Sequence, residues 1–207
     1  MARTFVKICG ITTPAALHAA IEAGADAVGF VFAESPRRVA PEAAAALARL
    51  VPPGILRVAV LRHPAPGEWQ AVLAAFEPDL LQTDAEDYAM LAVPAGIGRL
   101  PVYRDTPALD TGAVAREDRA LYEAAASGIG AMPDWRRART LAATTRLVLA
   151  GGLSPENVGA ALHAVHPWGV DVSSGVESSR GVKDPVRIAA FVAAVRRAEK
   201  EIVSGQH

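Results

Sequence analysis

The only cysteine of this 207-residue chain, Cys9, stands where a thiol could do chemistry. It ends a short apolar run, Thr4–Cys9, and Gly10 follows it directly. Side chains alternate between the two faces of a strand, so Lys7 and Cys9 are expected to share one face. A neighbouring ammonium lowers the pKa of a thiol, and the resulting thiolate can act as a base. The other interpretation is an inert buried cysteine, which from position alone is the commoner case.

Charged side chains follow two further apolar runs. Glu123 ends the run Ala120–Glu123, and a carboxyl group there suits a general acid when burial raises its pKa. A surface carboxylate fits the same position equally well. Arg37 and Arg38 follow the run Ala27–Phe32, and a guanidinium can pair with a carboxylate or phosphate through two hydrogen bonds. Adjacent arginines are commonly solvated, so only one of them is expected to face a site.

Small residues follow the last two apolar runs. They are Gly151, Gly152, Ser173, Ser174 and Gly175. Glycines let backbone amides approach an anion closely, and the N-terminus of a following helix favours negative charge. A single Gly-Gly pair also fits a plain turn. Two glycine-bearing loops in this part of the chain predict a site for a phosphorylated ligand.

Short, nearly continuous apolar runs alternate with alanine-rich stretches along the whole chain. The runs are Thr4–Cys9, Ala27–Phe32, Leu56–Leu61, Leu80–Gln82, Leu100–Arg104, Ala120–Glu123, Leu147–Ala150 and Gly169–Ser173. Such runs are typical of parallel strands that are buried on both faces. Their number and spacing predict an α/β fold, a single (β/α)8 TIM barrel domain over residues 1–207. A doubly wound open sheet is the alternative, although it usually has fewer strands.

Helix starts are marked by a capping side chain before a proline, at Thr13-Pro14, Ser154-Pro155 and Asp184-Pro185. The residues after Ala198 are expected to fray. Barrel closure places the last strand beside the first, and Asp171 faces the same side as Ser173. An ion pair between Asp171 and Lys7 is therefore expected inside the barrel, where it could also position a substrate.

Composition excludes several classes of protein. A formal net charge of −1 gives no electrostatic reason to bind nucleic acid. One cysteine excludes an intrachain disulfide and a cysteine-cluster metal site. No apolar stretch is long enough to cross a membrane, and no signal peptide is recognisable at the N-terminus. We therefore expect a cytoplasmic protein with no membrane association; a homodimer is possible.

Four blocks of the sequence are specific in combination. They are KICGIT at 7–12, GADAVGFVF at 24–32 with SPR at 35–37, LAGGL at 149–153 with PENV at 155–158, and GVDVSSGVE at 169–177 with GVKD at 181–184. Together they resemble the phosphoribosylanthranilate isomerase family of tryptophan biosynthesis, over nearly the whole chain. The resemblance implies an Amadori rearrangement of a phosphoribosyl substrate, N-(5′-phosphoribosyl)anthranilate, with neither a metal nor an organic cofactor.

The resemblance also implies roles for particular residues. Cys9 is the general base, Glu123 the general acid, and Arg37 rather than Arg38 holds the anthranilate carboxylate. From their place inside the barrel, Lys7 and Asp171 are also expected at the substrate site. The phosphate is expected at the small residues named above, as argued from their loops.

The chain departs from the family pattern at two strand ends. The family usually has Leu-Leu-Asp where this chain has Leu121-Tyr122-Glu123, so its acid is one methylene longer. The family's Gln-Leu-His-Gly is replaced by Gln82-Thr83-Asp84-Ala85, of which only Gln82 matches.

Two other classes of function are compatible with a phosphate-binding barrel: another phosphosugar enzyme, and a barrel that binds without catalysis. Indole-glycerol-phosphate synthase would need a catalytic lysine high in the barrel, whereas this chain has only Lys7, Lys183 and Lys200. A pentose-phosphate epimerase would need several inward histidine and aspartate ligands, and the histidines here fall mostly on expected helices or loops. A barrel that binds phosphosugars or partners without catalysis is favoured only by Glu123.

Overall fold

Eight parallel strands close into a barrel in the computed structural model, which describes residues 3–126 and 130–204. The strands are β1 (Phe5–Cys9), β2 (Ala27–Val31), β3 (Leu56–Val60), β4 (Leu80–Asp84), β5 (Gly98–Asp105), β6 (Arg119–Ala124), β7 (Arg146–Leu149) and β8 (Gly169–Val172). β8 pairs with β1 in parallel, with Lys7 opposite Asp171. The expected (β/α)8 barrel is confirmed, and the alternative of an open sheet is wrong because no strand of the ring lacks a second neighbour.

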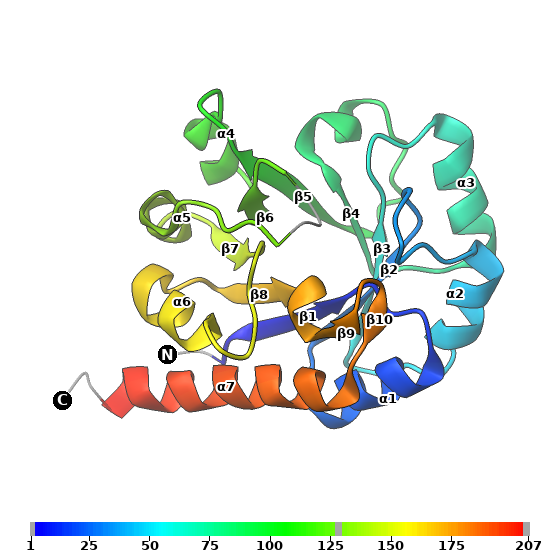
Figure 1. Ribbon diagram of the computed structural model, residues 1–207. Coiled ribbons are helices and arrows are strands. Elements are labelled where there is room, and N and C mark those ends of the chain that lie inside the picture. Colours follow the sequence, from blue (N-terminus) through cyan, green and yellow to red (C-terminus); the bar gives the residue numbers. More distant parts are fainter. Residues whose placement is uncertain (1–2, 127–129, 205–207) are drawn as a thin grey trace.

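Helices surround the ring of strands (Figure 1). They are α1 (Pro14–Glu22), α2 (Pro41–Ala48), α3 (Pro66–Ala75), α4 (Thr111–Ala115), α5 (Trp135–Ala142), α6 (Val158–Val165) and α7 (Pro185–Ser204). Two short 3₁₀ turns, η1 (Ala85–Ala89) and η2 (Ser174–Val176), follow β4 and β8. After η2, β9 (Glu177–Ser179) and β10 (Val182–Lys183) form a small antiparallel hairpin.

Two of the expected helix starts are confirmed and one is displaced. α1 begins at Pro14, where the Thr13 side chain accepts a hydrogen bond from the amide of Ala16. α7 begins at Pro185. α6 begins at Val158 rather than at Ser154-Pro155. The reason is a turn closed by Asn157, whose side chain accepts from the Ser154 amide and donates to the Gly152 carbonyl.

The alternation of side chains along the strands separates two apolar layers. The barrel interior is filled by Phe5, Ala27, Val58, Leu80, Leu100, Val102, Leu121, Val148 and Ala150. The opposite faces of the same strands, such as Val6, Ile8 and Tyr122, pack under the helices. Lys7 and Cys9 alternate with Val6 and Ile8, so they point into the barrel on the same side as Phe5. The expectation that they share an inward face is confirmed.

Several boundaries differ from the expected ones. β4 runs on from Gln82 to Asp84, so its last inward residue is a carboxylate. The residues after Ala198 remain helical to Ser204, against the expectation that the tail frays, and residues 205–207 lie outside the described part of the chain. Glu199 accounts for this because it accepts hydrogen bonds from the Thr4 amide and from Arg196. Among the described residues, no helix combines the length and apolar character needed to span a membrane.

Candidate active site

The carboxyl ends of the strands surround a cavity of about 250 Å³ at one mouth of the barrel. Five of the residues predicted from sequence line it: Cys9, Arg37, Glu123, Asp171 and Ser173. Lys7, Gly151, Gly152, Ser174 and Gly175 do not line it. This is the end of a parallel barrel where active sites are found, and we refer to it as the mouth cavity.

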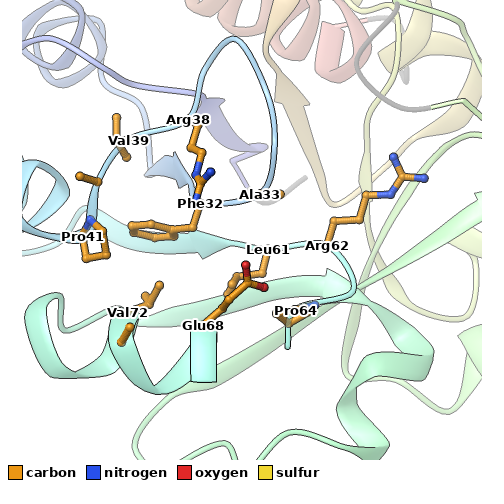
Figure 2. Close-up of a pocket in the computed structure, with 12 residues that line it drawn as sticks. Phe32, Ala33, Arg38, Val39, Pro41, Leu61, Arg62, Pro64, Glu68 and Val72 are labelled. Atoms are coloured by element: carbon orange, nitrogen blue, oxygen red, sulfur yellow. The ribbon is translucent and has the colours of Figure 1, made fainter. Parts of the chain in front are cut away.

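A larger cavity of about 490 Å³ lies beside the mouth cavity and shares Ala33, Leu61 and Arg62 with it. Figure 2 shows its mainly apolar wall, with the charged Arg38 and Glu68 among the lining side chains. It contains none of the residues to which the sequence assigned a role. Arg38, which was set aside in favour of Arg37, lies here.

Lys7 is fully buried inside the barrel, and its Nζ lies 2.8 Å from Asp171 Oδ1. The ion pair expected between these residues is therefore present. Gly29 makes room for it, because a Cβ there would lie 3.2 Å from Lys7 Nζ and 3.1 Å from Cys9 Sγ. Burial alone would lower the pKa of Lys7, but the charge of Asp171 and its hydrogen bond to the ammonium raise it overall. The lysine therefore stays charged.

Cys9 sits at the inner edge of the mouth cavity and is almost completely buried. Burial raises the pKa of its thiol, and the neighbouring Lys7 ammonium offsets part of that rise. The resting group is thus a thiol that faces a fixed positive charge. Such a charge stabilises the thiolate at the moment a proton leaves the sulfur.

Arg37 is held by a carboxylate that the sequence analysis did not single out. Its Nε and Nη2 donate to the two oxygens of Glu177 at 2.6 and 3.0 Å. Lys183 Nζ contacts the same carboxylate at 2.7 Å and the carbonyl of Ser173 at 2.9 Å. Burial would raise the pKa of Glu177, but hydrogen bonds from Arg37, Lys183 and the Gly181 amide lower it to about 2. The arginine is therefore oriented by the β9–β10 hairpin.

Glu123 lies in a second ion-pair network, on the β4–β6 side of the mouth cavity. Arg104 on β5 reaches it with Nη1 at 2.6 Å from Glu123 Oε1. The other arm of the same guanidinium, Nη2, lies 2.7 Å from Asp84 Oδ1. Asp84 and Arg104 are functional candidates that sequence reasoning missed. The signal that could have found them is their place at strand ends on the inward face.

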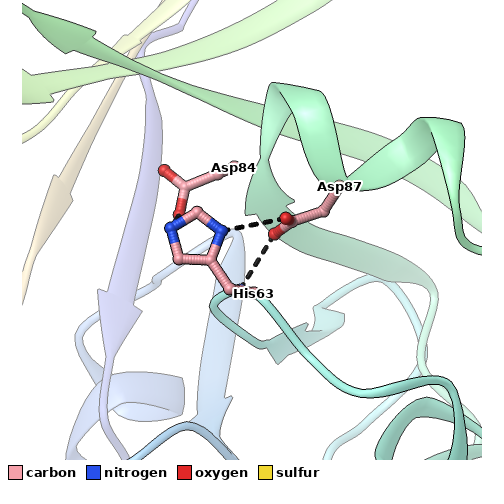
Figure 3. Close-up of side chains that lie close together, drawn as sticks. All are labelled: His63, Asp84 and Asp87. Atoms are coloured by element: carbon pink, nitrogen blue, oxygen red, sulfur yellow. Dashed lines mark hydrogen bonds and ion pairs between the residues drawn. The ribbon is translucent and has the colours of Figure 1, made fainter.

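A histidine adjoins this network. Figure 3 shows the imidazole of His63 between the carboxylates of Asp84 and Asp87. Nδ1 lies 3.0 Å from Asp87 Oδ1, and Nε2 lies 3.5 Å from Asp84 Oδ2. The hydrogen bond to Asp87 raises the pKa of His63. The histidine thus carries its positive charge to higher pH than a free imidazole does.

The same three side chains have donor atoms within 4.8 Å of one another, a spacing that could hold a metal ion. Their contacts argue against that role. Asp84 already pairs with Arg104, and Asp87 accepts from both Thr83 and the His63 backbone. A divalent cation would compete with a guanidinium at one ligand and with hydrogen bonds at another. We assign no metal function to this cluster.

The small residues predicted to bind phosphate lie in two neighbouring loops. Gly151 and Gly152 have positive φ angles of 89° and 62°, a conformation that favours glycine. A Cβ on Gly175 would lie only 1.9 Å from the carbonyl oxygen of Leu153, so the loop after β8 packs directly on the loop after β7. Ser173 donates to the Cys9 carbonyl, which joins this region to β1.

A family model for N-(5'phosphoribosyl)anthranilate (PRA) isomerase matches residues 6–194. The chain belongs to this family. The N-(5'-phosphoribosyl)anthranilate isomerase of Bordetella petrii is 42% identical over 216 residues, covering 97% of this chain and 98% of the relative.

Solved structures of the phosphoribosylanthranilate isomerase family have the same fold. The enzyme of Thermus thermophilus matches with a TM-score of 0.81 and 30% identity, over 94% of this chain and 99% of that one. Another matching structure, with a TM-score of 0.77 and 30% identity, is an isomerase in complex with reduced 1-(o-carboxyphenylamino)-1-deoxyribulose 5-phosphate. It also spans 94% of this chain and 99% of its own.

Proposed function

We propose that this chain catalyses the Amadori rearrangement of N-(5′-phosphoribosyl)anthranilate to 1-(2-carboxyphenylamino)-1-deoxyribulose 5-phosphate, a step of tryptophan biosynthesis. The observation that carries the proposal is that Cys9 and Glu123 line one cavity at the mouth of a barrel of this family. An aldose-to-ketose rearrangement needs one group that gives a proton and one that takes a proton. A carboxyl group and a thiol can supply these two roles.

The reaction begins at the ribose ring oxygen. Glu123 gives its proton to that oxygen, the ring opens, and the anthranilate nitrogen forms a Schiff base with C1′. The thiolate of Cys9 then takes the C2′ proton, which leaves an enolamine. Tautomerisation of the enolamine places a proton at C1′ and the carbonyl at C2′.

The fixed charges of the site support the second of these steps. Cys9 carries a negative charge only after it loses its proton, and burial opposes that loss. The Lys7 ammonium, itself fixed by Asp171, favours it most, and Lys183 adds a smaller contribution. We therefore assign Lys7 and Asp171 to the support of the base and, as the sequence predicted, to the substrate site.

Two further parts of the substrate have candidate partners. Arg37 presents its guanidinium to the mouth cavity, and its Nη1 donates no hydrogen bond to any described residue. We propose that this arm binds the anthranilate carboxylate while Glu177 holds the other two nitrogens. We assign the phosphate to Gly151, Gly152, Ser173, Ser174 and Gly175. The proposed reaction uses neither a metal nor an organic cofactor.

Steady-state turnover tests this proposal, followed as the loss of substrate fluorescence for the wild type, Cys9→Ser and Glu123→Gln. We expect wild-type turnover and a loss of at least about 10²-fold in kcat for each variant, the range that general acid or base groups contribute. Circular dichroism would confirm that each variant folds. Robust turnover by Glu123→Gln would place the acid elsewhere. A folded wild type that binds phosphate ligands but shows no turnover would move the chain to a different phosphosugar reaction or to binding alone.

Two predictions about the whole protein belong to the same proposal. A possible homodimer is tested by light scattering of the purified protein over a range of concentrations. A cytoplasmic location is tested by fractionation of cells of the source organism. Neither outcome alters the proposed reaction, because every residue assigned to it comes from one chain.

A further inference from the structure

One guanidinium bridges two carboxylates at the mouth of the barrel. Arg104 pairs in register with Glu123 across β5 and β6, while Val102 on the same strand pairs with Asp84 on β4. The two arms of Arg104 therefore reach in opposite directions, 2.6 Å to Glu123 and 2.7 Å to Asp84. Asp84 is the more buried carboxylate, with 4% of its side chain exposed against 18% for Glu123.

The bridge affects how Glu123 can act as an acid. A guanidinium against a carboxylate favours its charged form, and a charged carboxylate has no proton to give. If Arg104 faced Glu123 alone, its full charge would oppose the proposed first step. Asp84 supplies a second negative charge to the same guanidinium. The trio has a net charge of −1 when all three groups are ionised, so one proton can be held by a carboxylate without creating a net positive cluster.

We propose that Asp84 and Arg104 are positioning residues for this reaction: Arg104 aims Glu123 into the mouth cavity, and Asp84 balances Arg104 so that Glu123 can retain its proton. This inference rests on the proposed function, and within it on Glu123 as the acid. It concerns the two strand ends where the chain departs from the family pattern, Asp84 and Glu123, and joins them through one side chain.

Other charged groups face this trio from the surrounding elements. Arg62 and His63 come from the loop after β3, Asp87 from η1, Glu34 and Arg37 from the loop after β2, Arg180 from the loop after β9, and Cys9 and Asp171 from β1 and β8. His63 is the one that contacts Asp84 directly, at 3.5 Å from Oδ2. That oxygen is buried and has no hydrogen bond among the described residues. Because His63 titrates beside Asp84, a pH comparison must include a variant that lacks this histidine.

The test measures kcat of two variants relative to the wild type at each pH. As the pH rises, this ratio is expected to fall for one variant and to rise for the other. Asp84→Asn leaves the whole charge of Arg104 on Glu123. We expect kcat to fall about tenfold near neutral pH, with a defect that shrinks as the pH falls. Arg104→Gln removes the cation, so its kcat relative to wild type should instead improve as the pH rises. KM should change less than kcat in both variants.

Matched variants make the comparison specific. Asp84→Glu restores the negative charge and should recover most of the kcat lost in Asp84→Asn. His63→Asn removes the imidazole that titrates beside Asp84. When it is combined with Asp84→Asn or with Arg104→Gln, the opposite pH trends of these two variants should remain. Asp79→Asn removes a carboxylate from another arginine pair, Arg57, before β4 at the opposite end of the barrel. Its kcat relative to wild type should not depend on pH.

The outcomes separate this inference from the proposed function. Absence of wild-type turnover would contradict the proposed function. Wild-type turnover with a pH-independent defect in Asp84→Asn, or the same pH trend in Asp84→Asn and Arg104→Gln, would overturn the inference and leave the function intact. Circular dichroism would identify a variant that does not fold. If only one of the two variants folds, its pH trend still supports or contradicts the inference, because each variant has an expected trend of its own sign.

Discussion

At Cys9, burial and a neighbouring charge act on the same thiol in opposite directions. Burial raises its pKa because a thiolate is poorly solvated inside the barrel, and the ammonium of Lys7 recovers only part of that cost. The expected net result is a base that is protonated in the resting enzyme at neutral pH. The chemistry then depends on the small fraction of molecules in which the thiolate is present, or on substrate that changes its surroundings.

A thiolate titration measures this directly, because Cys9 is the only thiol of the chain. The ultraviolet absorbance of the thiolate, taken as wild type minus Cys9→Ser, should rise with a midpoint above the pKa of about 8.5 of a free cysteine. The sign follows from burial, which disfavours the charged form. A midpoint below that value would mean that Lys7 outweighs burial and that the resting group is a thiolate.

Some residue-level features follow from sequence periodicity and others do not. The shared face of Lys7 and Cys9, and the pairing of Lys7 with Asp171, follow from strand alternation and barrel closure. The contact between Arg37 and Glu177 does not. It depends on the β9–β10 hairpin folding back over the mouth of the barrel, and two charges 140 residues apart carry no local signal of meeting.

At the level of elements, all eight strands could be predicted, while the residues that end them could not be predicted as well. Apolar runs identify a buried strand, but β4 continues for two polar residues beyond its run, to Asp84. The polar end of a barrel strand does not differ in composition from a loop. Functional side chains lie at such ends, so the boundary errors fall on the site. This explains why Asp84 was missed, whereas Arg104 stands at the end of its expected run and was missed because nothing in the sequence pairs it with Glu123.

The loops after β7 and β8 depend on the absence of a side chain at Gly175. Gly175→Ala places a methyl group 1.9 Å from the Leu153 carbonyl oxygen, so the two loops must separate. We expect the free energy of unfolding to fall by about 2 kcal/mol, as for other overpacked sites. We also expect weaker binding of inorganic phosphate, measured by calorimetry.

Gly67→Ala is the matched control for that substitution, because nothing lies within 4 Å of the added Cβ. Alanine also has the higher helix propensity, so α3 should be unchanged or slightly more stable. If Gly175→Ala bound phosphate as tightly as Gly67→Ala, the assignment of phosphate to these two loops would be wrong.

At the scale of the whole molecule, one end of the barrel carries the candidate site and the other carries contacts that stabilise the fold. The carboxyl ends of the strands hold the ion-pair networks of the mouth cavity. Near the opposite end, the long helix α7, which lies outside the ring between α6 and α1, contacts Thr4 just before β1. Arg196 donates to the Thr4 carbonyl at 2.8 Å, and Glu199 accepts from the Thr4 amide. These contacts hold the start of the strand at which the ring closes on β8.

Glu199→Ala should therefore cost stability without changing catalysis. It leaves the amide of the largely buried Thr4 without its acceptor and removes the nearer of the two carboxylates that pair with Arg196, so that Asp26 at 3.4 Å remains. An unsatisfied buried donor costs about 2 kcal/mol, which for a chain of this size lowers the melting temperature by about 5 °C. Urea and thermal unfolding measure the loss, and kcat and KM at 25 °C should match the wild type. Glu201→Ala on the same helix removes an exposed carboxylate that pairs with His163 on α6, and should cost less than about 0.5 kcal/mol. Equal losses from the two substitutions would mean that α7 contributes only surface charge, and that barrel closure does not depend on its anchor to β1.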